Sequence, residues 1–299
     1  MKRILTPLFG ILFATSFAQQ EPQFTQYFEN TLLQNPAYAE SNKLLSVNTI
    51  HREQWVGFEG RPSSTSFQLH SPLKYESVGL GISAVRDVIG PTTQNMVYAD
   101  FSYTLKLSQN KFLAFGLKGG FTMINNKTST LTTVDNDPGL AVNTLNRINP
   151  NVGFGVYYHT DRFFLGVSSP KLMENSIDGS PNNLEKRHFY VHTGTLIPVN
   201  RDWNFRPTAQ FKSTVGAPIS LDASAAMIYK NKLFFGGMYR LKAAVGAFLQ
   251  YQINDQFRVG MASDFGTTQL RKYNQGTFEL LLSYDFNFLK GGIRSPRYF

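Results

Sequence analysis

The sequence has no cysteine among its 299 residues. This absence excludes a disulfide framework and also the lipidated cysteine that anchors a bacterial lipoprotein. Charged residues are scarce as well, at 16% of the chain against roughly 25% in typical globular proteins. No apolar run reaches the roughly 20 residues that a membrane-spanning helix needs. The composition argues against a disulfide-rich secreted domain, an ordinary soluble domain and a helical membrane protein.

The first 18 residues have the features of a signal peptide for export. Lys2 and Arg3 form a positive start, residues 4–17 are mostly apolar, and small residues precede the expected cut after Ala18. Gln19 is then the first mature residue; an uncleaved membrane anchor is the alternative. The chain is therefore predicted to leave the cytoplasm.

Aromatic residues make up 14% of the chain, with 26 Phe and 14 Tyr, yet the mean hydropathy is −0.22. A transmembrane β-barrel produces this combination, because its strands alternate lipid-facing apolar residues with polar residues that face the lumen. The net charge of +9 is spread without a run of five like charges. We therefore expect contact with outer-membrane lipid and no nucleic-acid partner.

Apolar and polar residues alternate with a period of two through most of the chain. In the last alternating segment, Phe278, Leu280 and Leu282 fall on one face, whereas Glu279 and Ser283 fall on the other. Several such segments meet the roughly 9–11 residues of a tilted membrane strand. Fourteen segments are predicted as strands: 44–52, 64–71, 76–86, 94–107, 111–124, 152–160, 162–169, 188–199, 202–213, 218–229, 232–241, 244–253, 256–265 and 276–288.

The connections between these strands alternate between two classes. One class is short and polar, and the other includes the long segments 53–63, 125–151, 170–187 and 266–275. Short periplasmic turns and longer extracellular loops are typical of outer-membrane barrels, whereas a soluble β-sandwich has no reason to keep this rule. We predict an all-β fold: a transmembrane antiparallel β-barrel of about 14 strands in one domain, residues 44–288. A periplasmic or plug segment, 19–43, precedes it, and a C-terminal tail, 289–299, follows.

No nucleophile elbow, zinc signature or phosphate-binding loop is present, so we predict neither an enzyme nor a cofactor. His188 and His192 lie on one strand, about 13 Å apart at roughly 3.3 Å per residue, too far to share one metal ion. Alternation instead directs a set of charges into the lumen. They either form an ion-paired interior or line a selective pore. The set is Asp100, Lys106, Lys118, Arg206, Lys212, Asp222, Arg240, Arg258, Asp264, Glu279 and Asp285.

Several segments together resemble the PorP/SprF family of outer-membrane proteins of the type IX secretion system. They are QFTQYFENTLLQNPAYAES from residue 23, HREQWVGFEGRPSSTSFQLHSPL from residue 51, SVGLGISAVRDVIGP from residue 77, RKYNQGTFELLLSYDF from residue 271, and the final SPRYF. QWVGFEGRP, about twenty residues after NPAY, is the most specific of these motifs. Phe278 stands where His is expected after Gly-Thr, and this departure does not affect the barrel prediction.

The resemblance implies a bacterial outer-membrane protein that aids export or surface attachment of specific secreted proteins, including adhesins used in gliding motility. It also implies that these partners carry a C-terminal sorting domain, and that other type IX secretion components take part. The alternative is a channel for hydrophobic small molecules. Fatty-acid transporters of the FadL type have fourteen strands and an Asn-Pro-Ala plug motif, which Asn35, Pro36 and Ala37 match, with Tyr38 next.

The first long loop is the candidate partner-binding site. Trp55 and Phe58 lie there beside Arg52 and Arg61, and aromatic and Arg side chains are the residues most often found as binding anchors. Two other roles stay open: the loop folds into the barrel mouth as a plug, or Trp55 belongs to the interfacial aromatic girdle.

Overall fold

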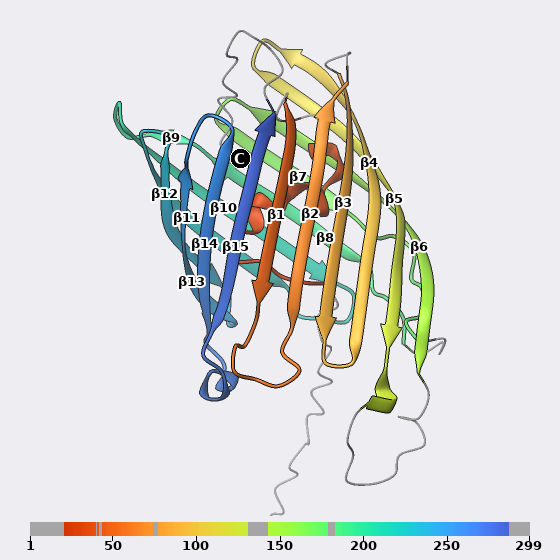
Figure 1. The fold of residues 1–299 in the computed structure, drawn as a ribbon. Coiled ribbons are helices and arrows are strands. Elements are labelled where there is room, and N and C mark those ends of the chain that lie inside the picture. The colour runs from red at the N-terminus through yellow and green to blue at the C-terminus, as the bar shows by residue number, and fades with distance from the viewer. Residues whose placement is uncertain are drawn as a thin grey trace, which may run out of the picture.

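A computed structural model describes residues 21–39, 41, 44–73, 77–130, 143–178 and 183–286. Its strands form one antiparallel sheet that curls into a barrel (Figure 1). The sheet closes because β1 pairs with β15, from Leu45 opposite Phe286 to Glu53 opposite Phe278. The predicted signal peptide, Gln19 and the C-terminal tail lie outside the described residues.

Fifteen strand segments make up the wall. They are β1 Leu45–Glu53, β2 Ser63–Pro72, β3 Val78–Ile89, β4 Thr92–Ser108, β5 Lys111–Asn126, β6 Thr144–Thr160, β7 Phe163–Ser169, β8 His188–Thr195, β9 Ile197–Pro198, β10 Trp203–Thr214, β11 Ser220–Tyr229, β12 Leu233–Arg240, β13 Ala244–Gln252, β14 Phe257–Gly266 and β15 Thr277–Phe286.

β8 and β9 are two parts of one interrupted strand. Both pair with β10 in the same register, with Gly194 opposite Thr208 and Ile197 opposite Phe205. That register brings Thr195 opposite Pro207, which has no N–H to give to the ladder, so the pairing is broken at this point. The barrel therefore has fourteen strands, which confirms the fold predicted from the sequence.

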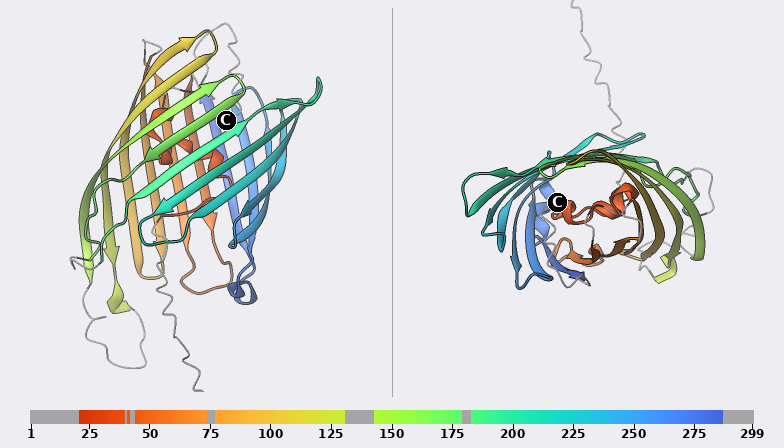
Figure 2. Two further views of the ribbon diagram at one scale, coloured as in Figure 1. Left: turned by 180° about the vertical axis from the view of Figure 1, so that it is seen from behind. Right: turned by 90° about the horizontal axis from the view of Figure 1, so that it is seen from above.

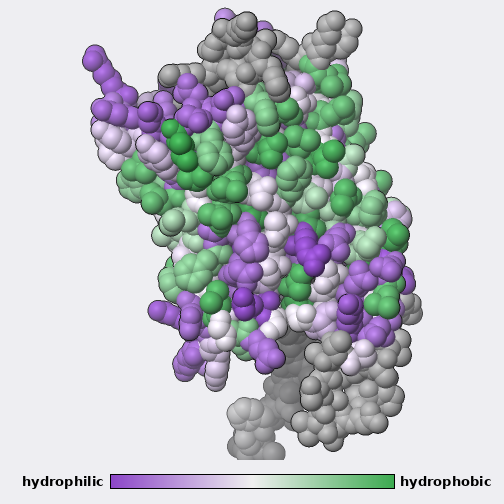
Figure 3. Space-filling view, in the orientation of Figure 1, coloured by the Kyte–Doolittle hydropathy of each residue, from purple (hydrophilic) through white to green (hydrophobic). Residues whose placement is uncertain are grey.

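The alternation of side chains is the one that the sequence predicts. In β15, Phe278 is 49% exposed, whereas Glu279 beside it is 4% exposed and faces the interior. Hydrophobic side chains are spread over the outer wall (Figure 3). This outward apolar surface is what contact with lipid requires.

The two classes of connection lie at opposite ends of the barrel (Figure 1). β1 runs towards the end that carries the long connections, and β15 runs back to the end that carries the short turns. We call these the loop end and the turn end. β6 begins at Thr144 rather than at the predicted residue 152. Its first part is rich in Asn and contains Pro150, so it lacks the apolar alternation by which strands are recognised.

An irregular N-terminal segment, residues 21–39, lies inside the barrel (Figure 2). It contains the short helices η1 Tyr27–Glu29, α1 Thr31–Gln34 and η2 Pro36–Tyr38. Its apolar side chains pack with those of the wall in the internal core: Tyr27 and Phe28 belong to one cluster, and Leu32, Ala37 and Tyr38 belong to another. We call residues 21–39 the inner segment.

Candidate functional site

The inner segment is held at the loop end by a buried ion cluster. Arg52 of β1 donates from Nη1 to Asp264 Oδ2 at 2.7 Å, to Glu279 Oε1 at 2.6 Å and to Thr25 Oγ1 at 2.9 Å. Glu279 in turn accepts the backbone N–H groups of Thr25 and Gln26, at 2.5 and 3.0 Å. All three charged side chains are buried, so the strand wall and the inner segment share one polar centre in which a single cation pairs with two carboxylates.

A second contact holds the middle of the inner segment. Glu29 accepts from Arg258 of β14 at 2.8 Å, and the Arg206 guanidinium of β10 lies 3.9 Å from the same carboxylate. Arg206 also lies over the Phe28 ring, 4.5 Å from its centroid. The charge of Glu29 therefore links the segment to β14, the strand that also carries Asp264 of the first cluster, and to β10.

Asn35, Pro36 and Ala37 pack against a flat part of the wall that only glycine allows. Asn35 accepts from the Ala37 N–H at 3.0 Å, which caps η2, and its Nδ2 donates to Val156 O at 3.0 Å. A Cβ on Gly116 would collide with the backbone of Pro36 and Ala37, and a Cβ on Gly155 with the Asn35 side chain. The predicted plug motif thus lies inside the lumen, in direct contact with the wall.

The predicted lumen charges are mostly buried and paired. Lys118 lies 2.7 Å from Asp100, and Asp222 lies 3.0 Å from Lys212 and 2.9 Å from Arg240. Three predicted members are not buried. Lys106 is exposed near the end of β4, Arg258 is half-buried, and Asp285 is half-buried and accepts from Ser46 Oγ at 2.6 Å. Among the described residues, most of these charges pair with one another or with the inner segment.

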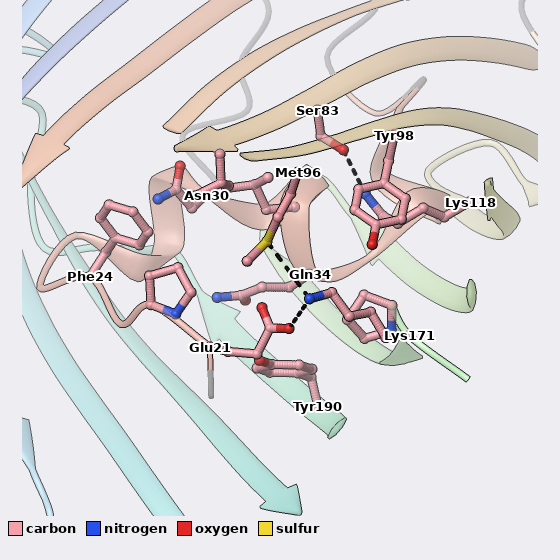
Figure 4. A pocket seen from close by; sticks show the side chains of 14 residues that line it. Glu21, Phe24, Asn30, Gln34, Ser83, Met96, Tyr98, Lys118, Lys171 and Tyr190 are labelled. Atoms are coloured by element: carbon pink, nitrogen blue, oxygen red, sulfur yellow. Dashed lines mark hydrogen bonds and ion pairs between the residues drawn. The ribbon is translucent and has the colours of Figure 1, made fainter. Parts of the chain in front are cut away.

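A cavity remains beside the inner segment (Figure 4). Its volume of about 50 Å³ holds only a few water molecules. Lys171 reaches into it from the connection after β7 and pairs with Glu21 at 2.6 Å. Burial opposes ionisation of Glu21, but the ammonium of Lys171 leads the charges that outweigh it, so the pKa of the carboxyl lies below its ordinary value of 4.5. This pair could not be predicted from sequence, because the two residues are far apart in the chain.

Two of the long connections join into one surface at the loop end. In the first long loop, residues 54–62, the N–H of Val56 donates to Gly276 O at 2.9 Å, and Val56 O accepts from the N–H of Gln275 at 2.8 Å. Gln275 and Gly276 belong to the last long loop, residues 267–276. These backbone hydrogen bonds fix the two loops against each other.

The candidate partner-binding residues divide between this surface and the interior. Phe58 is 46% exposed and its ring meets that of Trp55 edge to face, 6.5 Å between centroids. Arg61 is exposed and pairs with Glu53 at 2.8 Å. Arg52 does not belong to this exposed group, because it is buried in the ion cluster. Tyr273, 71% exposed on the adjoining loop, is an aromatic residue of the same surface that sequence reasoning missed.

Within the described ranges, no three His, Asp or Glu side chains are grouped so as to hold a metal ion. His188 and His192 are both buried in β8. In the same part of the chain, no helix has the length and apolar character to cross a membrane.

Comparison with protein families gives one match over nearly the whole chain. The family model described as type IX secretion system membrane protein PorP/SprF matches residues 16–284. A sequence comparison with curated proteins gives no significant match.

Solved outer-membrane barrels share the architecture at low sequence identity. The toluene transporter TodX of Pseudomonas putida superposes with a TM-score of 0.52 at 13% identity, over 87% of this chain and 94% of that one. A FadL homologue of Pseudomonas aeruginosa gives 0.47 at 12% identity, over 85% and 93%. The Acinetobacter baumannii outer-membrane protein Omp33 gives 0.47 at 9% identity, over 82% and 100%. The likeness to TodX shows a common barrel fold, and its low identity gives no function.

Proposed function

Because the chain belongs to the PorP/SprF family of type IX secretion system membrane proteins, we propose that it aids export or surface attachment of specific secreted proteins. It is a β-barrel of the bacterial outer membrane and is associated with type IX secretion. The proposed clients carry a C-terminal sorting domain and include adhesins, and other secretion components assist. The family match over residues 16–284 is the observation that carries this proposal.

The filled lumen supports a role carried out by loops rather than by a pore. The inner segment contacts the inner face of the wall at several strands, through Arg52, through Glu29 and through the glycine contact of Ala37. The cavity of about 50 Å³ beside it is far smaller than the 300–1,000 Å³ typical of small-ligand sites. A folded protein cannot pass such a lumen, so the barrel is proposed to hold its client at the surface.

The paired loops at the loop end are the proposed client contact. Trp55, Phe58 and Tyr273 bring aromatic surface together there, and Arg61 adds a charged group. Hydrogen bonds through Val56 hold both loops together, so little conformational entropy is lost when a client binds them. Long loops on a rigid scaffold are common places for partner binding.

A hydrocarbon channel is the second candidate. The fold shared with TodX, named a toluene transporter, favours it, as does the Asn-Pro-Ala motif within the lumen. Transport would require the inner segment to move, because it occupies the path.

Deleting the gene separates the two candidates. The proposal predicts that a small set of sorting-domain proteins disappears from the cell surface while uptake of long-chain fatty acids and toluene stays normal. A normal surface proteome with lost uptake would instead favour the channel.

A further inference from the structure

The inner segment has its two ends at opposite ends of the barrel. Thr25 contacts Arg52, Asp264 and Glu279. All three lie within three residues of where their strands meet the long loops, since β1 ends at Glu53, β14 ends at Gly266 and β15 begins at Thr277. The start of the inner segment is therefore at the loop end.

The other end of the inner segment lies towards the turn end. Ala39 O is 3.0 Å from His70 Nδ1, two residues before β2 ends at Pro72. The chain then enters β1 at Leu45, which is also at the turn end. The segment consequently passes along the lumen from the loop end to the turn end before the first strand begins.

Of the residues that precede Thr25, Gln23 lies among groups of the loop end, whereas Glu21 lines a cavity with Ser83 and Lys118 from the middle of β3 and β5. Glu21 pairs with Lys171, two residues after β7 ends at Ser169. Gln23 lines a small cavity together with Thr214, the last residue of β10, and Pro218 in the following connection. The connection that carries Lys171 is itself fixed to β6, because Asn151 Oδ1 accepts from the N–H groups of Leu172 and Met173, each at 2.9 Å.

From this path we propose that the inner segment threads the barrel from the loop end to the turn end, so that Gln23 lies at the extracellular mouth. Long loops are extracellular in outer-membrane barrels, so a partner that docks on the loop end meets Gln23 as well as the first long loop. The Glu21–Lys171 pair fastens the threaded end to the connection after β7. The path of the inner segment is the same whichever client is exported, and it is the same if the barrel exports no client.

Cysteine labelling tests the path directly, because the chain has no native thiol. Three single variants are compared in intact cells with a membrane-impermeant maleimide: Gln23→Cys, the loop-end control Glu59→Cys and the turn-end control Gln109→Cys. Gln23→Cys and Glu59→Cys are expected to react in intact cells, whereas Gln109→Cys reacts only after the outer membrane is opened. If Gln23→Cys, like Gln109→Cys, reacts only after the outer membrane is opened, the proposal is overturned.

A cross-linking measurement covers the case in which Gln23 is shielded from the reagent. A short bismaleimide is expected to join Gln23→Cys to Thr214→Cys and not to Gln109→Cys, in barrels that still migrate differently on gels before and after heating. A link to Gln109→Cys, or no link to Thr214→Cys in such folded barrels, contradicts threading from the loop end. Neither readout requires secretion activity, so failure of the proposed function leaves this test unaffected.

Discussion

Replacing Arg52 by methionine should destabilise the barrel strongly, because the residue is buried at the centre of the ion cluster. The variant leaves the carboxylates of Asp264 and Glu279 buried without the cation that pairs with both, and Thr25 loses a hydrogen-bond donor. Removing one partner of a buried ion pair typically costs about 3–5 kcal/mol. We expect a loss of free energy of unfolding in this range, measured by urea titration of the barrel in lipid vesicles with tryptophan fluorescence.

Arg61→Met is the matched control. It removes the same type of side chain from an exposed pair with Glu53, and exposed pairs contribute at most about 1 kcal/mol. Neutralising the acidic partners as well, by Asp264→Asn and Glu279→Gln, should restore much of the loss in the Arg52→Met background. If Arg52→Met and Arg61→Met unfold at the same urea concentration, the buried cluster does not hold the inner segment as argued.

Three further outcomes follow from the interior. Gly116→Ala should displace the inner segment and lower the temperature at which the barrel loses its compact gel mobility. Gly119→Ala, where a Cβ meets nothing within 4 Å, should leave that temperature unchanged. If both variants lower the temperature equally, Gly116 does not make the proposed contact. The lowered pKa of Glu21 means that its ion pair stabilises the fold above pH 4.5 and loses this effect as pH falls through the lowered value. The wild type should therefore have a higher free energy of unfolding in urea than Glu21→Gln at neutral pH, and this difference should vanish in acid. A difference that does not change with pH would contradict the pairing. The purified barrel should show no steady conductance in planar bilayers, because the cavity beside the inner segment has room for only a few waters; an open pore would refute a filled lumen.

The strands could be predicted from sequence because a membrane wall imposes alternation residue by residue. Phe278 and Glu279 reveal their faces without any knowledge of their neighbours. Where the wall lacks apolar alternation, as in the Asn-rich start of β6, the signal is lost. The break after β8 was missed for another reason: its cause, Pro207, lies on the neighbouring strand.

The candidate site was harder to predict, because its contacts depend on how the barrel closes. Alternation identifies Asp264 and Glu279 as lumen charges, but Arg52, the last residue of a predicted strand, is grouped by sequence with the binding residues of the next loop. Its pairing with residues 212 and 227 positions away follows only from strand tilt and register. The inner segment has no periodicity that gives its direction. Its aromatic residues, such as Tyr27 and Phe28, were the available sign that it is buried.

Surface display by loop variants tests the central claim most directly, namely that the barrel acts through its extracellular loops. A deletion strain is complemented with the wild-type chain, with Trp55→Ala/Phe58→Ala, or with the control Arg201→Met, which changes an exposed arginine in the short turn between β9 and β10. Surface proteins that carry a sorting domain are then quantified. We predict that the double variant assembles a heat-modifiable barrel and loses client display about 30-fold or more, in line with the 2 kcal/mol or more typical of an aromatic anchor, whereas Arg201→Met keeps most of it. Full display by the double variant, with the barrel intact, would contradict the account.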